Sequence, residues 1–174
     1  MRDAMVAAIN LNLFNKNSDR VKMANIAQTV NVLQAVILTE GEKMLLTPTW
    51  HVFKLFRDHQ ENTLLDSVLE CDKIPTIKGN LAQITESVSE DENGHTHITL
   101  ANLSATDAVT MEVELLGREV QKAAGEMLTN TIYAYNTFDE PDKVKTQKVE
   151  AIKVSKDKLE VVLPSCCVMH LEVE

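Results

Sequence analysis

The 174-residue sequence has few aromatic residues, few cysteines and no long apolar run. Aromatic residues are 4% of the chain, which weakens the case for a module that would bind sugars on a platform of exposed rings. Cys71, Cys166 and Cys167 form neither a metal-ligand spacing nor a disulfide framework, so we interpret them as reduced, buried thiols. No apolar stretch approaches the roughly 20 residues that a membrane-spanning helix requires.

Basic residues are also in deficit. The chain has 17 Lys and Arg against 26 Asp and Glu, a formal net charge of -9. Nucleic-acid binding depends on neutralising phosphates with basic side chains, so this balance disfavours a nucleic-acid partner. Anionic membranes would repel the same surface. A neutral ligand such as a sugar is compatible with this charge.

The residues that are present suit a globular protein. Hydrophobic residues are 44% and charged residues 25%, enough to build a core. The segment 1–10 is apolar but contains an early Asp3 and ends in Asn10, which is a poor match to a signal peptide.

The first 60 residues read as a piece of an α/β fold. Residues 2–14 are apolar on nearly every face, which predicts a buried helix. Residues 21–27 suit a short buried strand, and residues 28–46 form a long connection. A second helix is expected from Thr47-Pro48, with Thr47 as the N-cap and apolar residues at spacings of three and four. These elements cannot bury themselves, so we interpret them as the end of a larger α/β domain.

The pattern after residue 60 is that of β-strands. Alternating or apolar runs occur at 83–89, 96–100, 109–115, 127–135, 149–154, 159–163 and 168–173. Polar turns rich in Asp, Asn, Ser and Gly separate them. About seven short strands with polar turns predict an antiparallel sandwich.

Three separated motifs resemble family 51 glycoside hydrolases, the α-L-arabinofuranosidases. The segments DRVKMANIAQTVNVLQ (19–34) and LTPTWHVF (46–53) are similar to the end of that family's catalytic barrel. The segment YNTFDEPDKV (135–144) is similar to part of its C-terminal domain. The resemblance implies a mainly β chain, an antiparallel jelly-roll-like β-sandwich preceded by the last α/β segment of a (β/α)8 TIM barrel. Residues 1–60 would be the barrel remnant, with strand eight at 21–27, and residues 61–174 the sandwich.

The same resemblance implies a function for a longer parent protein. Family members remove terminal non-reducing α-L-arabinofuranosyl residues from arabinan or arabinoxylan with retention, using two glutamates about 5 Å apart. Both glutamates would lie upstream of residue 1, so the isolated chain is expected to be inactive. No cofactor and no metal is implied, and a homo-oligomer is expected because family members commonly associate.

Gln28 is the candidate substrate-binding residue. It would stand at the C-terminal end of the eighth barrel strand, the end where such barrels carry their active sites. In the family the matching glutamine hydrogen-bonds the arabinofuranose. Its amide offers donors and an acceptor to sugar hydroxyls but no proton-transfer group. Asn25 and Asn31 are weaker candidates, which we interpret as structural.

The remaining polar candidates have plainer interpretations. His95 and His97 alternate on one strand, and without a third ligand nearby they read as a surface pair. His51, His59 and Trp50 read as helix packing or helix-surface residues. His170 lacks a supporting acid, so a nucleophilic role for the neighbouring thiols is disfavoured. Four glutamates are expected to be solvated or in a loop, namely Glu40, Glu42, Glu112 and Glu114.

An alternative stays open: a stand-alone carbohydrate-binding or structural β-sandwich module. Residues 63–174 would then bind carbohydrate by themselves. If the chain is instead a barrel end plus a sandwich, its unpartnered apolar surface predicts self-association or a loosely ordered N-terminal third.

Overall fold

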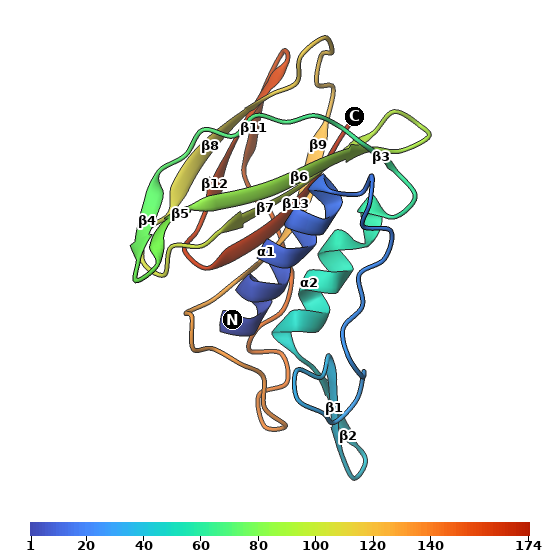
Figure 1. The fold of residues 1–174 in the computed structure, drawn as a ribbon, viewed down its shortest axis with the longest axis vertical. Helices are drawn as coiled ribbons and strands as arrows, with labels where there is room; N and C mark the ends of the chain where they lie inside the picture. Colours follow the sequence, from blue (N-terminus) through green and yellow to red (C-terminus); the bar gives the residue numbers. More distant parts are fainter.

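The computed structural model describes residues 1–174, in which two helices pack on a β-sandwich (Figure 1). The helical elements are α1 (Arg2–Lys16), α2 (Pro48–Phe56) and the 3-10 turn η1 (Arg57–His59). The strands are β1 (Ile37–Glu40), β2 (Lys43–Leu46), β3 (Thr63–Leu64), β4 (Lys73–Thr76), β5 (Gly79–Ala82), β6 (Ile84–Glu90), β7 (Thr96–Asn102), β8 (Val109–Glu114), β9 (Ala123–Thr129), β10 (Gln147–Lys148), β11 (Ile152–Ser155), β12 (Lys158–Leu163) and β13 (Cys167–Val173).

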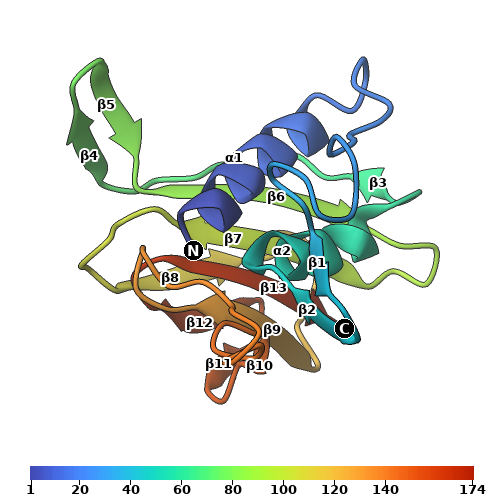
Figure 2. The same cartoon turned by 90° about the horizontal axis from the view of Figure 1, so that it is seen from below.

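The elements form three layers. A six-stranded sheet in the order β10-β9-β13-β7-β6-β3 is the middle layer, and a three-stranded sheet in the order β11-β12-β8 covers one of its faces. Helices α1 and α2 lie side by side on the other face (Figures 1 and 2). All strand pairs within these sheets are antiparallel, so the predicted antiparallel sandwich is confirmed.

The space between the two sheets is an apolar core. Strands β7 and β13 contribute Ile98, Leu100, Met169 and Leu171, each at most 2% exposed. Strand β12 supplies Leu159, Val161 and Leu163 from the opposite sheet. Alternate residues of each strand point inward, which is the period-two pattern that predicted these strands.

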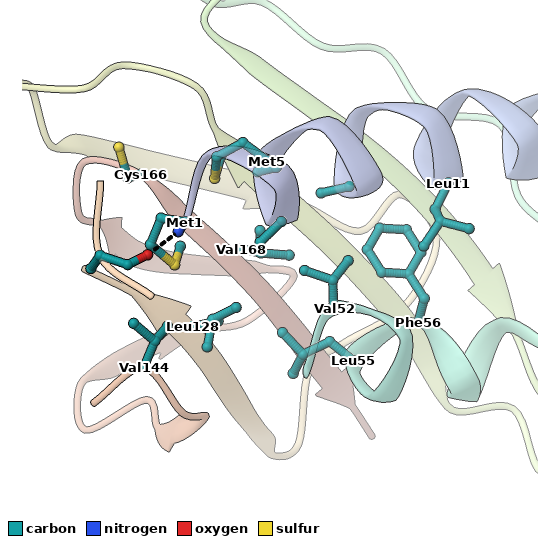
Figure 3. Close-up of a cluster of buried hydrophobic side chains, with 14 residues drawn as sticks. Met1, Met5, Leu11, Val52, Leu55, Phe56, Leu128, Val144, Cys166 and Val168 are labelled. Carbon is teal, nitrogen blue, oxygen red and sulfur yellow. Dashed lines mark hydrogen bonds between the residues drawn. The ribbon is translucent and has the colours of Figure 1, made fainter. Parts of the chain in front are cut away.

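The opposite face of the six-stranded sheet is buried by the helices. Ala4, Ala8 and Leu11 of α1 and Val52, Leu55 and Phe56 of α2 form one cluster with Ala101, Leu128 and Val168 of the sheet (Figure 3). The small side chains of Ala4 and Ala8, both fully buried, leave room for close approach of the helix. Because both faces are covered, every residue of β7 is buried.

Gly125 allows two strands of the middle sheet to come together. A Cβ atom at this position would lie 2.6 Å from the His170 carbonyl oxygen and 2.7 Å from Leu171 Cδ2. Both distances are shorter than real Cβ contacts, so a side chain here would force β9 away from β13. The Ala-Ala-Gly sequence of β9 looks unlike a strand, and the strand expected at 127–135 lies in fact at 123–129.

Three local expectations for the first 60 residues are corrected. Residues 21–27 are not a strand but irregular and largely exposed, with Met23 76% exposed. A parallel barrel strand needs neighbours on both sides, and this chain supplies none. The expected connection at 28–46 contains a hairpin, β1–β2. The Thr47 hydroxyl makes no cap bond but donates to the Ala35 carbonyl oxygen at 3.0 Å.

None of the helices is both long enough and apolar enough to span a membrane.

Candidate functional site

Gln28 lies in the exposed segment that joins α1 to β1. Its backbone adopts φ 56°, in the left-handed region that residues other than glycine rarely occupy. Its side chain is exposed and makes no hydrogen bond within the chain. The side-chain amide is therefore free to bind a ligand, and the backbone conformation sets the direction in which the Gln28 side chain points.

A compact turn directly follows Gln28. The Thr29 carbonyl oxygen accepts from the amides of Val36 and Ile37, at 3.2 and 3.1 Å. The Asn31 side chain bridges to Thr39, accepting from its amide at 2.7 Å and donating to its hydroxyl at 2.8 Å. Asn31 therefore has the structural role that the sequence suggested.

A cavity of about 400 Å³ opens between this segment, the start of α1 and the irregular chain at 132–136. Its walls include Tyr133 and Tyr135, which are 83% and 65% exposed, and Gln34, but not Gln28. Asn136 anchors one wall, because its amide donates to the Leu46 and Val144 carbonyl oxygens at 2.8 Å each. This contact explains why an asparagine stands in the Tyr-Asn-Thr-Phe motif.

A buried polar network occupies part of the space between α1 and the middle sheet. The hydroxyls of Ser87 and Thr99 both donate to Asn12 Oδ1, at 2.8 and 2.7 Å. Asn12 is fully buried, and its Nδ2 has no partner. His59 of η1 extends the network, with Nδ1 2.7 Å from the Ser89 hydroxyl and Nε2 3.0 Å from the Thr99 hydroxyl. The sheet face under the helices is thus polar along part of its length.

Two further histidines and an aspartate lie next to His59. His97 Nδ1 is 3.3 Å from His170 Nε2, and the two rings are parallel within 9°. Asp58 Oδ2 lies 3.9 Å from His170 Nδ1. Asp91 Oδ2 lies 3.8 Å from His97 Nε2. Two neighbouring imidazoles, with a carboxylate at each end, therefore run from η1 across β13 and β7 to the loop after β6.

Burial keeps His59 and His170 uncharged. Desolvation, reinforced by the neighbouring rings of His170 and His97, lowers the pKa of His59 to about 3. Desolvation also lowers the pKa of His170, although Asp58 opposes this shift. Both imidazoles are therefore neutral at neutral pH, and each has one N–H donor and one nitrogen that accepts.

The structure corrects the interpretation of two histidines. His97 is 5% exposed and His170 is 7% exposed, so His95 and His97 are not a surface pair and His170 does have an acid, Asp58, beside it. The cause is strand pairing: β7 and β13 are neighbours, and His97 and His170 are diagonal neighbours on one face. In the sequence, only the His-x-His spacing at 95–97 indicated a site, because the residues that lie beside His97, namely His170 and Asp58, come from distant segments.

Other expectations for single residues are confirmed. Glu112 and Glu114 are exposed on β8, where Lys158 lies 2.8 and 3.7 Å from them. Cys166 and Cys167 are buried as expected, whereas Cys71 is only partly buried. Desolvation raises the pKa of Cys166 and raises that of Cys167 to about 12, so neither is an activated thiol. Trp50 packs its ring edge-on to His51, with centroids 5.1 Å apart, in the helix layer.

Comparison with known proteins assigns a relationship to almost the whole chain. The family model described as the alpha-L-arabinofuranosidase C-terminal domain matches residues 1–166. An intracellular exo-alpha-L-arabinofuranosidase of Bacteroides ovatus is 39% identical over 177 residues, covering 100% of this chain and 34% of its own length. The chain therefore spans about a third of that relative.

Solved structures show the same relationship. The GH51 arabinofuranosidase from Xanthomonas axonopodis pv. citri superposes with a TM-score of 0.94 at 36% identity, covering 99% of this chain and 35% of its own. The thermostable GH51 alpha-L-arabinofuranosidase from Thermotoga petrophila RKU-1 gives a TM-score of 0.87 at 26% identity, covering 99% of this chain and 38% of its own. In each case the match is to about a third of a longer chain.

Proposed function

Because the chain belongs to the alpha-L-arabinofuranosidase C-terminal domain family, we propose that it is the C-terminal portion of a retaining exo-acting α-L-arabinofuranosidase. The longer protein would release terminal non-reducing α-L-arabinofuranosyl residues from arabinan- or arabinoxylan-type chains. The family match over residues 1–166 is the observation that carries this proposal. The superposition on a GH51 arabinofuranosidase with a TM-score of 0.94 supports it.

We propose that the chain has two parts with different roles and a boundary near residue 60. Residues 1–60 would complete the catalytic barrel and residues 61–174 would form the accessory sandwich. The exposure of residues 22–25 and 27–31 supports this division, because a chain that completes a barrel must present its backbone and side chains to partners outside this chain. Leu33 is 92% exposed, as expected for an apolar side chain that would be buried against the rest of the longer protein.

Gln28 is the proposed contact to the sugar. Its exposed amide, its lack of an internal partner and the rigid turn behind it suit a residue that orients a bound arabinofuranose. A neutral hydrogen bond contributes about 0.5–1.5 kcal/mol, equivalent to roughly a 2- to 12-fold change in an equilibrium constant. Replacing Gln28 should therefore lower catalytic efficiency modestly without abolishing it.

The chemistry itself would come from outside this chain. Retaining hydrolysis requires one carboxylic acid to protonate the leaving oxygen and a second carboxylate about 5 Å away to attack the anomeric carbon. We propose that both are glutamates of the upstream barrel. The chain's contribution would be to close the barrel and to place Gln28 beside that pair.

A chimera tests this proposal with defined parts. This chain would replace the matching C-terminal third of the Bacteroides ovatus exo-alpha-L-arabinofuranosidase, to which it aligns over its full length. We expect the chimera to hydrolyse a chromogenic α-L-arabinofuranoside and Gln28→Ala to lower kcat/KM by about 2- to 12-fold. The matched control is Gln60→Ala, an exposed glutamine after η1, which should leave kcat/KM unchanged. A folded chimera without activity would contradict the proposal, and equal kcat/KM for Gln28→Ala would remove Gln28 from the site.

We also propose that the longer protein forms a homo-oligomer. The sandwich exposes apolar side chains that it does not use internally, including Val68 at 95% and Ile77 at 105% exposed. Light scattering on the chimera checks this directly. A monomer at micromolar concentration would refute the oligomer without affecting the hydrolase proposal.

The rival function is a carbohydrate-binding module. Exposed Tyr133 and Tyr135 beside the 400 Å³ cavity are the observation in its favour. Retention of the isolated chain on immobilised arabinan would support it, and loss of retention in Tyr133→Ala would locate the site. If the chain passes through the arabinan column without being retained, the proposal that it is the C-terminal portion of a hydrolase is favoured.

A further inference from the structure

We propose that Asp58, His97 and His170 form a binding site for one divalent transition-metal ion of the zinc type. The three residues come from η1, β7 and β13, which are far apart in the sequence. One ligand atom from each lies within 4.8 Å of the other two. The proposal concerns stability and does not depend on the proposed hydrolase function.

The two imidazoles are already at the separation that a metal would impose. Zinc binds histidine nitrogens at about 2.0–2.1 Å, and at the tetrahedral angle two such nitrogens stand about 3.3 Å apart. His97 Nδ1 and His170 Nε2 are 3.3 Å apart. Both side chains are under 10% exposed, so packing holds this spacing.

The carboxylate is the adjustable ligand. Asp58 is 31% exposed, and its Oδ1 accepts from Arg57 Nε at 3.0 Å, while Oδ2 lies 3.9 Å from His170 Nδ1, the ring nitrogen that does not face His97. One carboxylate oxygen lies within 4.8 Å of a nitrogen of each histidine, so the side chain has to rotate toward the His97–His170 gap to bind the same ion. Its exposure also gives a metal and a fourth ligand, water, a route into the site.

A second carboxylate supports the first imidazole from behind. Asp91 Oδ2 lies 3.8 Å from His97 Nε2, on the ring edge opposite the proposed ion. Metal-binding histidines commonly donate their other N–H to such a carboxylate, which fixes the tautomer and the ring orientation. Asp91 is itself held by the amides of Asn93 and His95, at 2.9 and 2.8 Å. Asp91 is therefore a positioning residue.

The donor set selects the class of ion. Two imidazoles and one carboxylate suit zinc and related ions, whereas magnesium and calcium prefer oxygen ligands throughout. A bound ion would tie η1, and with it the end of α2, to the two central strands of the sheet. The expected role is to lock the helix layer onto the sandwich.

The test uses the full 174-residue chain after removal of metals with a chelator. We expect calorimetric titration with ZnCl2 to give one site per chain, with no heat from MgCl2. Zinc should raise the thermal midpoint, and Co2+ should give the visible absorption of a four-coordinate site. His170→Gln and Asp58→Asn should weaken zinc binding by roughly 100-fold or more and Asp91→Asn by about 10- to 100-fold.

Asp66→Asn is the matched control for Asp58→Asn, because it removes an exposed carboxylate that is outside the proposed ligand set. It should bind zinc as the parent chain does. If His170→Gln fails to fold, Asp58→Asn and the Co2+ spectrum of the parent chain still decide the question. Absence of zinc binding by the parent chain, or unchanged affinity in Asp58→Asn or in folded His170→Gln, would overturn the site.

Discussion

The two faces of the six-stranded sheet are buried by different chemistry. The face toward the three-stranded sheet is mainly apolar, with Ile98, Leu100, Met169 and Leu171 in its core. The face under the helices is apolar near Ala101 and Val168 but carries Ser87, Thr99 and two histidines, His97 and His170, further along. Apolar packing is non-directional, whereas hydrogen bonds require fixed partners. The polar contacts therefore specify where the helices lie, while the apolar clusters on both faces contribute the stability.

The largest expected effects come from truncating apolar side chains on either face. Leu171→Ala in the sandwich core and Leu55→Ala in the helix layer should each lower the free energy of unfolding by about 2–5 kcal/mol. Both residues are at most 2% exposed. Leu13→Ala, on a residue of α1 that is 54% exposed, is the control and should have little effect.

These variants also test whether the two faces unfold together. The one tryptophan, Trp50, reports on the helix layer, whereas far-UV circular dichroism reports on the helices and the sheets together. Because the helix cluster shares residues with the sheet, we expect the two signals to change in one transition, in the parent chain and in Leu55→Ala. An earlier Trp50 transition would mean that the N-terminal third is loosely attached.

A smaller effect is expected from the polar network. Asn12→Ala leaves the Ser87 and Thr99 hydroxyls buried without their common acceptor, which should cost about 1–3 kcal/mol of unfolding free energy. Asn10→Ala is the matched control, because Asn10 is exposed on the same helix and bonds only the Val6 carbonyl oxygen. Chemical denaturation measures both. Equal stabilities for the two variants would show that the network contributes nothing.

Lowering the pH should reduce the free energy of unfolding through the histidines buried between the helices and the sheet. The unfolded chain protonates His59 near pH 6.5, but the folded chain does so only at about 3. The unfolded state therefore binds more protons between these values, and the free energy of unfolding falls as the pH is lowered, by at most about 1.4 kcal/mol per pH unit for this group. Burial lowers the pKa of His51 in the same direction. In chelator, His59→Gln should flatten the pH profile, and an unchanged slope would contradict this assignment.

The smallest effect is expected on the outer surface of the three-stranded sheet. Lys158 pairs with Glu112 and Glu114 in solvent, where such pairs contribute little because water and salt screen them. Lys158→Ala should leave the thermal midpoint unchanged within error. A clear fall would show that this sheet depends on its charges more than its exposure suggests.

The sequence predicted the strands whose environment is simple. β8 and β12 alternate because one face meets the core and the other meets solvent, and β13 is apolar because both its faces are buried. The strand expected at 21–27 was wrong for this chain because parallel strands form only beside neighbours. The β4–β5 hairpin was missed, since Pro75 and Gly79 interrupt its pattern.

The two candidate sites also differ in how much of each could be predicted from local sequence. Gln28 followed from a contiguous motif, so one segment of sequence was enough to single it out. The histidine cluster joins positions 58, 97 and 170, and nothing local indicates that β13 pairs with β7. A site built from distant strands becomes visible only when the pairing of those strands is known.

Hydrolysis of a chromogenic α-L-arabinofuranoside tests the central claim most directly. This chain alone and the chimera that joins it to the upstream part of the Bacteroides ovatus relative would be assayed side by side. The account predicts that the chimera is active and that the isolated chain, although folded, is silent. Activity of the isolated chain would contradict the account, because the catalytic carboxylates would then have to lie among its own residues.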